Sequence, residues 1–332
     1  MDNQLIKVSN HLGMEVSFSP VGAAIFDILI PTIKGLIPVT VHPQDIGEFN
    51  QSLGHFGKTI GRIAGRIRFG QFSLNNHEYQ IGPREMHGLH GGNASLAFKE
   101  FQVSQHENQF ASIIMFTYMS PDGESGFPGN MRIQVTYQIP HLLNQIDIIY
   151  HAFSDRDTVM NLSNHTYWNL NGSGDILSHY LRINADQYAE IDEYACPQSI
   201  ENITPSMDFR QPHRIGDYIN HESLISTGGY NHPYICDDRQ ELRPIASLFG
   251  NQSHIQLTLY SDYPTLVFYS GNVASREVTN YQLPYLKHQA LALECQFLPN
   301  AMNQAFGQKK TGFLPANTNY RQQITLAFSV LD

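Results

Sequence analysis

The sequence predicts an all-β protein built from antiparallel sheets. Three stretches alternate apolar and polar residues with a period of two, as strands do when one face is buried and the other is solvated; they cover residues 131–139, 255–259 and 324–330. Clusters of Gly, Pro, Asn and Asp separate such stretches at the short spacing typical of sandwiches and barrels. No long stretch has the 3.6-residue period of an amphipathic helix. We therefore expect antiparallel strands joined by turns and long loops, with few and short helices.

The clearest expected strand, residues 131–139, alternates apolar residues such as Ile133 and Val135 with polar residues such as Arg132 and Gln134. The stretches that begin at Ile255 and Ile324 repeat this pattern, so all three are expected to have one buried and one solvated face. Turns are expected at three clusters that combine glycine with proline or asparagine, which are residues 120–123, 128–130 and 171–174.

Residues 196–250 are the least regular part of the chain and are rich in Pro, His, Asp and Asn. Within them, residues 204–210 predict a long excursion over the sheet and not a second domain. Loops of such length in compact folds are usually functional. Because no internal repeat, low-complexity segment or linker divides the chain, we expect a single domain over residues 1–332.

The composition favours an uncharged ligand. Charged residues make up 15% of the chain, against about 25% in typical soluble proteins, so the polar surface is largely neutral. The net charge is −10, and no run of Lys and Arg offers a surface for nucleic acid or anionic lipid. We therefore expect neither nucleic acid nor a membrane as a partner.

Three cysteines, Cys196, Cys236 and Cys295, lie far apart without the Cys-x-x-Cys spacing of a metal site. Their odd number argues against a disulfide framework and favours a reducing compartment. The N-terminal residues lack a basic start followed by an apolar stretch, and no apolar run reaches the 18 residues that a membrane helix needs. We expect a cytoplasmic protein.

Residues 161–170 hold the densest set of hydrogen-bonding side chains. If they form one strand, alternate residues share a face, and the polar face consists of Asn161, Ser163, His165, Tyr167 and Asn169. Such a row around a histidine suits a polyhydroxylated ligand. The alternative is a polar surface strand with a hydrogen-bonded histidine. Trp168 points to the opposite face, so we expect it to pack in the core.

Residues 291–297 are expected to form an apolar strand that contains one acid, Glu294, between Ala292 and Gln296 on the same face. Partial burial would raise the pKa of Glu294 and make it a proton acceptor near neutral pH. The alternative is a carboxylate paired with an arginine.

Residues 61–67 place Arg62 and Arg66 among small residues, where a guanidinium could reach a ligand oxygen; the alternative is a pair of surface or structural arginines. Residues 87–92 pair His87 with His90 among glycines. A metal there would need a further ligand such as His165, and no His-Glu-x-x-His spacing supports one. A turn histidine is the simpler alternative.

Residues 229–234 add an amide and an imidazole, Asn231 and His232, beside a proline. These groups together suggest proton transfer on an uncharged, hydroxyl-rich molecule. No serine elbow, phosphate loop or cofactor fingerprint accompanies them.

The chain resembles the aldose 1-epimerases, also called galactose mutarotases, almost from end to end. Each shared motif is short, but their order and spacing together are specific. The motifs are residues 22–25, 61–67, 89–92, 120–123 with 126–129, 161–165 with Tyr167 and 169–170, 205–210, 268–272, and 293–296 with Pro299, Ala301 and Asn303.

This resemblance implies a single-domain, galactose mutarotase-like β-supersandwich with the sugar in an open cleft on the sheet. It implies that Glu294 is the general base for the anomeric hydroxyl and that His165 is the general acid for the ring oxygen. It also implies that His90 and Arg66 contact the sugar, and that no cofactor or metal is required. The expected partner is a neutral monosaccharide such as galactose or glucose, bound by a monomer or homodimer.

We expect Asn231 and Tyr167 to lie beside the sugar, with Tyr167, Asn161 and Asn169 also orienting His165. Two positions depart from the family pattern, since many relatives carry Asp at the position of Asn231 and Gln at that of Val267. An amide loses the charge-assisted acceptor, and valine cannot hydrogen-bond at all. Two alternatives therefore stay open: a hexose-6-phosphate 1-epimerase, which would need a cluster of basic side chains, and a catalytically silent sugar-binding protein.

Overall fold

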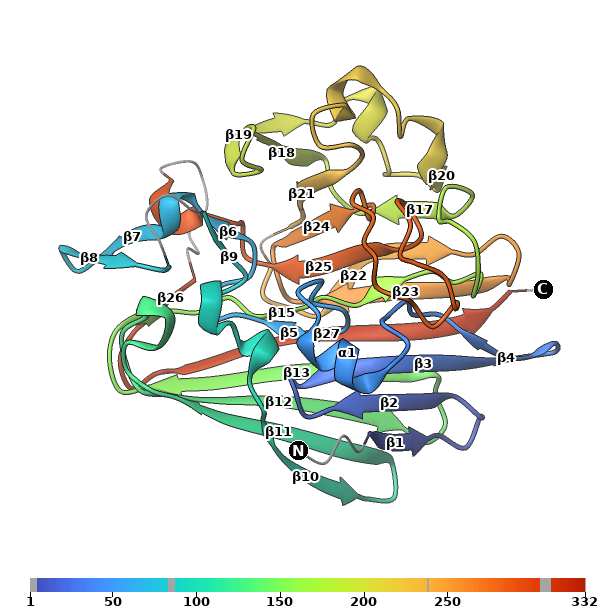
Figure 1. Ribbon diagram of the computed structural model, residues 1–332, viewed down its shortest axis with the longest axis horizontal. Coiled ribbons are helices and arrows are strands. Elements are labelled where there is room, and N and C mark those ends of the chain that lie inside the picture. The colour runs from blue at the N-terminus through green and yellow to red at the C-terminus, as the bar shows by residue number, and fades with distance from the viewer. Residues whose placement is uncertain (1–4, 83–86, 238, 305–311, 332) are drawn as a thin grey trace.

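The computed structural model describes residues 5–82, 87–237, 239–304 and 312–331. Three antiparallel sheets of nine, six and four strands make up most of it (Figure 1). The predicted all-β class is therefore confirmed. The single-domain organisation over residues 1–332 stays a prediction.

The nine-stranded sheet is the largest element of the fold. Its strands, in spatial order, are β10 (Gln102–Glu107), β11 (Ala111–Ser120), β12 (Met131–Pro140), β13 (Gln145–Ser154), β27 (Asn319–Val330), β23 (Ile255–Ser261), β22 (Arg243–Phe249), β17 (Tyr180–Ile183) and β20 (His213–Arg214). The three predicted alternating stretches lie in β12, β23 and β27. Met131, Ile133 and Val135 on β12 are fully buried, while Arg132 is exposed and Gln134 half-buried between them, as the period of two predicts.

The six-stranded sheet carries the residues of the predicted site. Its order is β16 (Tyr167–Trp168), β25 (Leu291–Gln296), β24 (Thr265–Tyr269), β21 (Asn231–Ile235), β18 (Gln187–Ile191) and β19 (Pro197–Asn202). All six residues of β25 are buried. In its pairing with β24, Glu294 lies opposite Val267 and Gln296 lies opposite Thr265. Residues directly opposite each other in an antiparallel pair share a face, so these four side chains point the same way.

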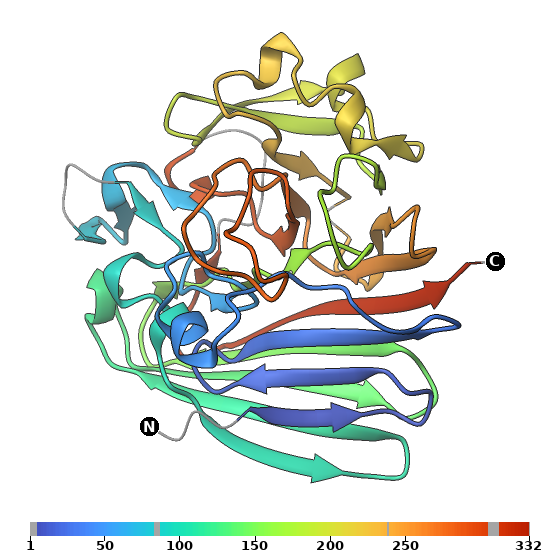
Figure 2. The same ribbon diagram turned by 45° about the vertical axis from the view of Figure 1, so that its right-hand side comes forward.

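The four-stranded sheet contains β1 (Ile6–Ser9), β2 (Glu15–Ser19), β3 (Ala24–Thr32) and β4 (Gly35–Pro38), and it lies against the large sheet in both views (Figures 1 and 2). The Phe18 ring on β2 lies 4.7 Å from that of Tyr137 on β12. A single apolar cluster includes these residues together with Phe268 and Leu293 of the six-stranded sheet. One core therefore connects all three sheets.

Short elements complete the fold. The one α-helix in the described residues is α1 (Ile46–Gln51), which begins where the Asp45 side chain accepts hydrogen bonds from Gly47 N and Glu48 N. Four two-stranded ladders pair β5 (Thr59–Ile60) with β15 (Ser163–Asn164), β6 (Arg66–Ile67) with β9 (Gly88–Leu89), β7 (Gln71–Leu74) with β8 (His77–Gln80), and β14 (Thr158–Val159) with β26 (Phe313–Leu314). Single 3₁₀ turns are η1 (Arg68–Gly70), η2 (Gly92–Ala94), η3 (Leu96–Phe98), η4 (Glu124–Gly126), η5 (Pro205–Met207), η6 (Ile215–Asp217), η7 (Glu222–Leu224) and η8 (Ala301–Asn303). Among the described residues, every helix is too short to cross a membrane.

The condition of one continuous strand over residues 161–170 is not met. The chain forms β15 and β16 with a break at His165 and Thr166 between them. The backbone of His165 instead bonds to a neighbouring loop, since Gly57 N donates to His165 O and His165 N donates to Lys58 O. These long-range bonds replace the regular ladder. The prediction for Trp168 is confirmed, because it is 2% exposed and packs on Phe328.

Residues 196–250 are more regular than predicted, because β19, β20, β21 and β22 all lie within them. Pro233 in β21 lacks an N–H. Strand β21 pairs with β18 only through the neighbouring Tyr234 and Ile235, so the missing N–H breaks no pairing with β18. Residues 204–210 do form an irregular excursion around η5. The three cysteines are free and buried.

Candidate active site

The six predicted site residues all line one cavity of about 300 Å³. Small-molecule sites span about 300–1,000 Å³, so this cavity suits a compact ligand. Its predicted residues come from segments far apart in the chain: Arg66, His90, His165, Tyr167, Asn231 and Glu294. Val267 and several residues that the sequence did not single out complete the wall, including His55, Tyr269 and Gln296.

Glu294 lies in the middle of β25 and is 3% exposed. Burial raises the pKa of its carboxyl to about 8, although the charge of Arg66 opposes the shift. Its Oε2 has no hydrogen-bond partner within the described part of the chain. Glu294 is therefore a carboxylic acid near pH 7 that lines the cavity, with one buried oxygen left without a partner in the described protein.

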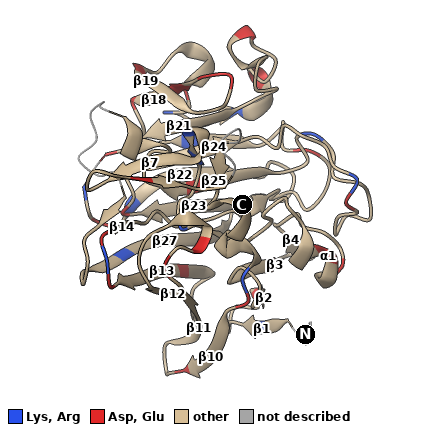
Figure 3. Cartoon of the chain, turned by 60° about the vertical axis from the view of Figure 1, so that its left-hand side comes forward, with Lys and Arg blue, Asp and Glu red and all other residues tan. Residues whose placement is uncertain are grey.

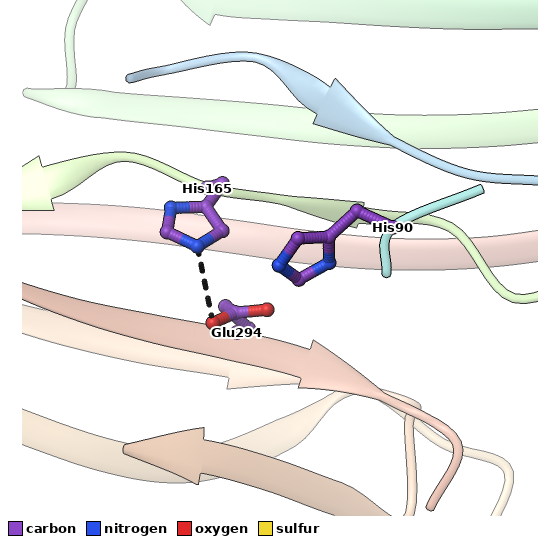
Figure 4. A group of neighbouring side chains, drawn as sticks. All are labelled: His90, His165 and Glu294. Atoms are coloured by element: carbon purple, nitrogen blue, oxygen red, sulfur yellow. Dashed lines mark ion pairs between the residues drawn. The ribbon is translucent and has the colours of Figure 1, made fainter. Parts of the chain in front are cut away.

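His165 is the only ion-pair partner of Glu294 among the described residues, and Figure 4 shows the two side chains facing each other. The distance from His165 Nε2 to Glu294 Oε1 is 3.5 Å, which is longer than an ordinary hydrogen bond. Burial lowers the pKa of His165 to about 4. Near pH 7 the pair therefore holds one proton, and burial favours its location on Glu294.

His90 stands beside this pair, with its ring centroid 5.2 Å from that of His165 and nearly perpendicular to it (Figure 4). Gly65 N donates a hydrogen bond to His90 Nδ1. Burial holds the pKa of His90 well below its ordinary value, so the ring is neutral. A neutral imidazole that accepts at Nδ1 carries its proton at Nε2. His90 is therefore a hydrogen-bond donor.

The position of His90 depends on the glycine that follows it. Gly91 has a φ of +95°, which L side chains rarely adopt. A Cβ atom there would lie 1.8 Å from the carbonyl oxygen of Gly61. Only glycine lets these two segments approach so closely, and this approach brings His90 to the cavity.

His90, His165 and Glu294 offer ligand atoms that lie within 4.8 Å of one another. Two histidines and a glutamate form the ligand set of some catalytic zinc sites. The tautomer of His90 does not fit this reading, because its Nε2 carries a proton and its Nδ1 accepts from Gly65 N. His87, the other member of the predicted pair, lies elsewhere, where its Nδ1 accepts from Phe69 N.

The two predicted arginines have different environments. Arg66 lines the cavity. Arg62 is 3% exposed and donates to the Ser120 hydroxyl and to the backbone carbonyls of Ser120, Pro121, Pro128 and Gly129. Arg62 is therefore a structural arginine, which was the alternative to ligand contact, whereas Arg66 is placed to contact a ligand.

Tyr167 packs beside His165, with ring centroids 5.0 Å apart. The two asparagines that were expected to orient His165 bond elsewhere among the described residues. Asn161 holds the backbone of Phe297 through both of its side-chain polar atoms. Asn169 donates to the carbonyls of Ser173, Gly174 and Gln289. Both asparagines support neighbouring segments instead of the imidazole ring.

A sequence profile of the family described as aldose 1-epimerase matches residues 4–327. The chain belongs to the aldose 1-epimerase family. Aldose 1-epimerase from Escherichia coli K12 is 30% identical over 325 residues, covering 96% of this chain and 92% of that protein. Galactose mutarotase from Rattus norvegicus is 32% identical over 269 residues, or 78% of this chain and 75% of the relative. A crystal structure of an aldose epimerase homologue from C. elegans has a TM-score of 0.86 at 26% identity and covers 99% of both chains.

Within this aldose 1-epimerase family member, both departures from the family pattern face the cavity. Asn231 and Val267 belong to its lining, and Val267 lies directly across the ladder from Glu294. The neighbour of the carboxyl across the ladder is therefore an apolar side chain.

His55 and Gln296 are two of the lining residues that the sequence analysis did not single out. His55 places its ring 5.0 Å from that of His90 and 6.0 Å from that of His165. Burial lowers the pKa of His55 to about 3, helped by the charges of His165 and Lys58. A lone histidine between Gly54 and Phe56 gave no pattern that could have identified it. Gln296 was noted only as a neighbour of Glu294.

Proposed function

We propose that this protein is an aldose 1-epimerase, an isomerase that interconverts the α and β anomers of neutral aldohexoses such as galactose and glucose. The observation that carries the proposal is the buried pair of Glu294 and His165, 3.5 Å apart in a cavity that suits a compact ligand. Two groups whose environments shift their pKa values in opposite directions are typical of acid–base catalysis.

In this mechanism Glu294 accepts the proton of the anomeric hydroxyl while His165 donates a proton to the ring oxygen. The C1–O5 bond breaks and leaves a free aldehyde. Rotation about the C1–C2 bond then presents the other face of the carbonyl. The reverse proton transfers close the ring, so Glu294 returns its proton to the sugar oxygen at C1 and His165 recovers a proton from the hydroxyl at C5.

The reactive form needs a carboxylate and an imidazolium, whereas burial favours the neutral pair. Both forms hold one proton, so moving it from Glu294 to His165 leaves the charge of the site unchanged. Sugar hydroxyls that hydrogen-bond to the carboxylate favour this transfer. The Nε2–H of His90 and the guanidinium of Arg66 supply donors for the ring oxygen and hydroxyls. Tyr167 and Asn231 contact the sugar from the sides of the cavity.

The charge of the cavity supports a neutral sugar over a hexose 6-phosphate. Among the described lining residues, Arg66 is the only Lys or Arg, and a phosphate site typically gathers several such groups. Figure 3 shows Lys and Arg as short, scattered segments of the cartoon. A catalytically silent sugar-binding protein is disfavoured because the acid and the base are both present.

We infer a reducing, cytoplasmic location from the three buried, unpaired cysteines. The expectation of a monomer or homodimer stays a prediction.

Polarimetry of freshly dissolved α-D-glucose and α-D-galactose tests the proposal. The protein should accelerate the decay of optical rotation for at least one sugar, and Glu294→Gln should remove nearly all of that acceleration. Glucose 6-phosphate, measured by exchange NMR in the same buffer, should be a poorer substrate. Sugar binding by calorimetry without any acceleration would contradict the enzyme and support the silent binding protein.

A further inference from the structure

Gln296 has an unusual environment for a buried glutamine. Its side chain is fully buried, yet neither Oε1 nor Nε2 has a hydrogen-bond partner among the described residues. Burying an amide without partners is costly, and such groups are rare in folded proteins. A ligand that forms hydrogen bonds with this amide would explain why position 296 holds a glutamine.

The position of Gln296 connects it to the catalytic pair. It lines the same cavity as Glu294 and lies two residues further along β25. Side chains two residues apart on a strand share a face and stand about 7 Å apart. This separation is close to the span of a pyranose ring with its hydroxyls. A sugar with its anomeric hydroxyl at Glu294 can therefore present its far end to Gln296.

The neighbourhood restricts which groups could bind the far end of the sugar. Thr265, opposite Gln296 in the ladder, has a buried hydroxyl without a partner among the described residues. Val267 and Pro233, which line the same cavity, offer no side-chain donor or acceptor. The polar lining residues Asn231 and Tyr269 lie in register with Ala292, on the other side of Glu294. On the side of Glu294 toward the end of β25, Gln296 is the lining residue of these strands that can bind a hydroxyl.

The chemistry of a primary amide indicates the kind of group it binds. Its NH₂ donates while its carbonyl oxygen accepts, and the two lie side by side. Two adjacent hydroxyls of a sugar offer the matching acceptor and donor. We propose that Gln296 is a specificity-determining residue that binds two vicinal hydroxyls at the end of the sugar remote from C1. The inference rests on the proposed epimerase function and adds a requirement for a free vicinal diol at that end.

Gln296→Met tests this proposal, because methionine has a similar length and no amide. The rate of mutarotation is measured for D-glucose and its 2-, 3-, 4- and 6-deoxy analogues with wild type and variant. For D-glucose we expect kcat/KM to fall about 10- to 100-fold, mainly through KM, since a bond to a buried polar group is lost. The analogue that lacks the bound hydroxyl should already be slow with wild type and should lose much less on substitution.

Stability measurements separate binding from folding. Replacing a partnerless buried amide by an apolar chain should leave the urea midpoint unchanged or raise it. Gln289→Met is the matched control: this buried glutamine accepts from Leu286 N and lies outside the cavity lining, so its variant should lose stability but keep KM. Gln296→Leu repeats the test with a second apolar side chain.

Two results would overturn the proposal. One is an unchanged KM for D-glucose in both Gln296 variants. The other is an equal loss of kcat/KM for glucose and every deoxy analogue, which would mean that no particular hydroxyl meets the amide. A wild-type protein that accelerates neither glucose nor galactose would instead overturn the epimerase function, so the two failures are distinguishable.

Discussion

Glu294→Gln should make the protein more stable near neutral pH while it removes catalysis. The folded protein holds the carboxyl pKa at about 8, against an ordinary value of 4.5. Between these values the folded state binds more protons than the unfolded state, so the free energy of unfolding falls as pH rises. Glutamine has the same shape and no proton to lose, so the variant avoids this penalty.

The size of the effect follows from the pKa shift. Within this window, each pH unit lowers the free energy of unfolding of the wild type by about 1.4 kcal/mol relative to that of the variant. The resulting difference in free energy of unfolding, called the gap below, is about 3 kcal/mol at pH 7 and falls below about 1 kcal/mol at pH 5. Glu294 is buried, so solvent screening does not reduce this value substantially.

Urea unfolding of both proteins at pH 5 and pH 7, followed by circular dichroism, measures the gap. Glu78→Gln, at an exposed position on β8, controls for the loss of one negative charge. A gap between Glu294→Gln and wild type that stays constant from pH 5 to pH 7 would refute the reasoning.

Four further outcomes are expected. His165→Asn should lower kcat about 10²- to 10⁴-fold by polarimetry, as for other positioned acids and bases; an unchanged rate would remove His165 from the mechanism. The profile of kcat/KM against pH should be bell-shaped, because activity needs the pair of Glu294 and His165 with one shared proton. A second proton on His165 should lower kcat/KM below about pH 4, and loss of the last proton from Glu294 should lower kcat/KM above about pH 8. A flat profile between pH 6 and pH 9 would contradict the assignment. Arg62→Met should destabilise the fold by about 3 kcal/mol or more, since it leaves buried carbonyls unpaired, but should preserve kcat/KM per folded molecule. Arg66→Met should show the opposite pattern, and equal losses of activity in the two variants would contradict their separate roles.

The predictions from sequence succeeded where the pattern is local. Alternation along residues 131–139 identified β12 because one face of that strand is buried and the other is not. The motifs around Arg66, His165 and Glu294 led to residues that line one cavity. Their chemical roles stay predictions.

The failures arose where contacts between distant segments decide the structure. The strand considered for residues 161–170 is interrupted at His165, where the backbone bonds to Gly57 and Lys58. No periodic pattern encodes that partner choice. Gln296 could not be singled out either, because its lack of partners is a property of three-dimensional packing.

The wide separation of the site residues along the chain has a consequence for synthesis. His90 lies in the first third of the sequence, whereas Glu294 comes near its end. A nascent chain can therefore bring the two groups together only after most of the protein has left the ribosome. Sheets formed by such distant pairings have a high contact order and fold slowly. Catalytic activity should consequently be among the last properties that a newly made molecule acquires.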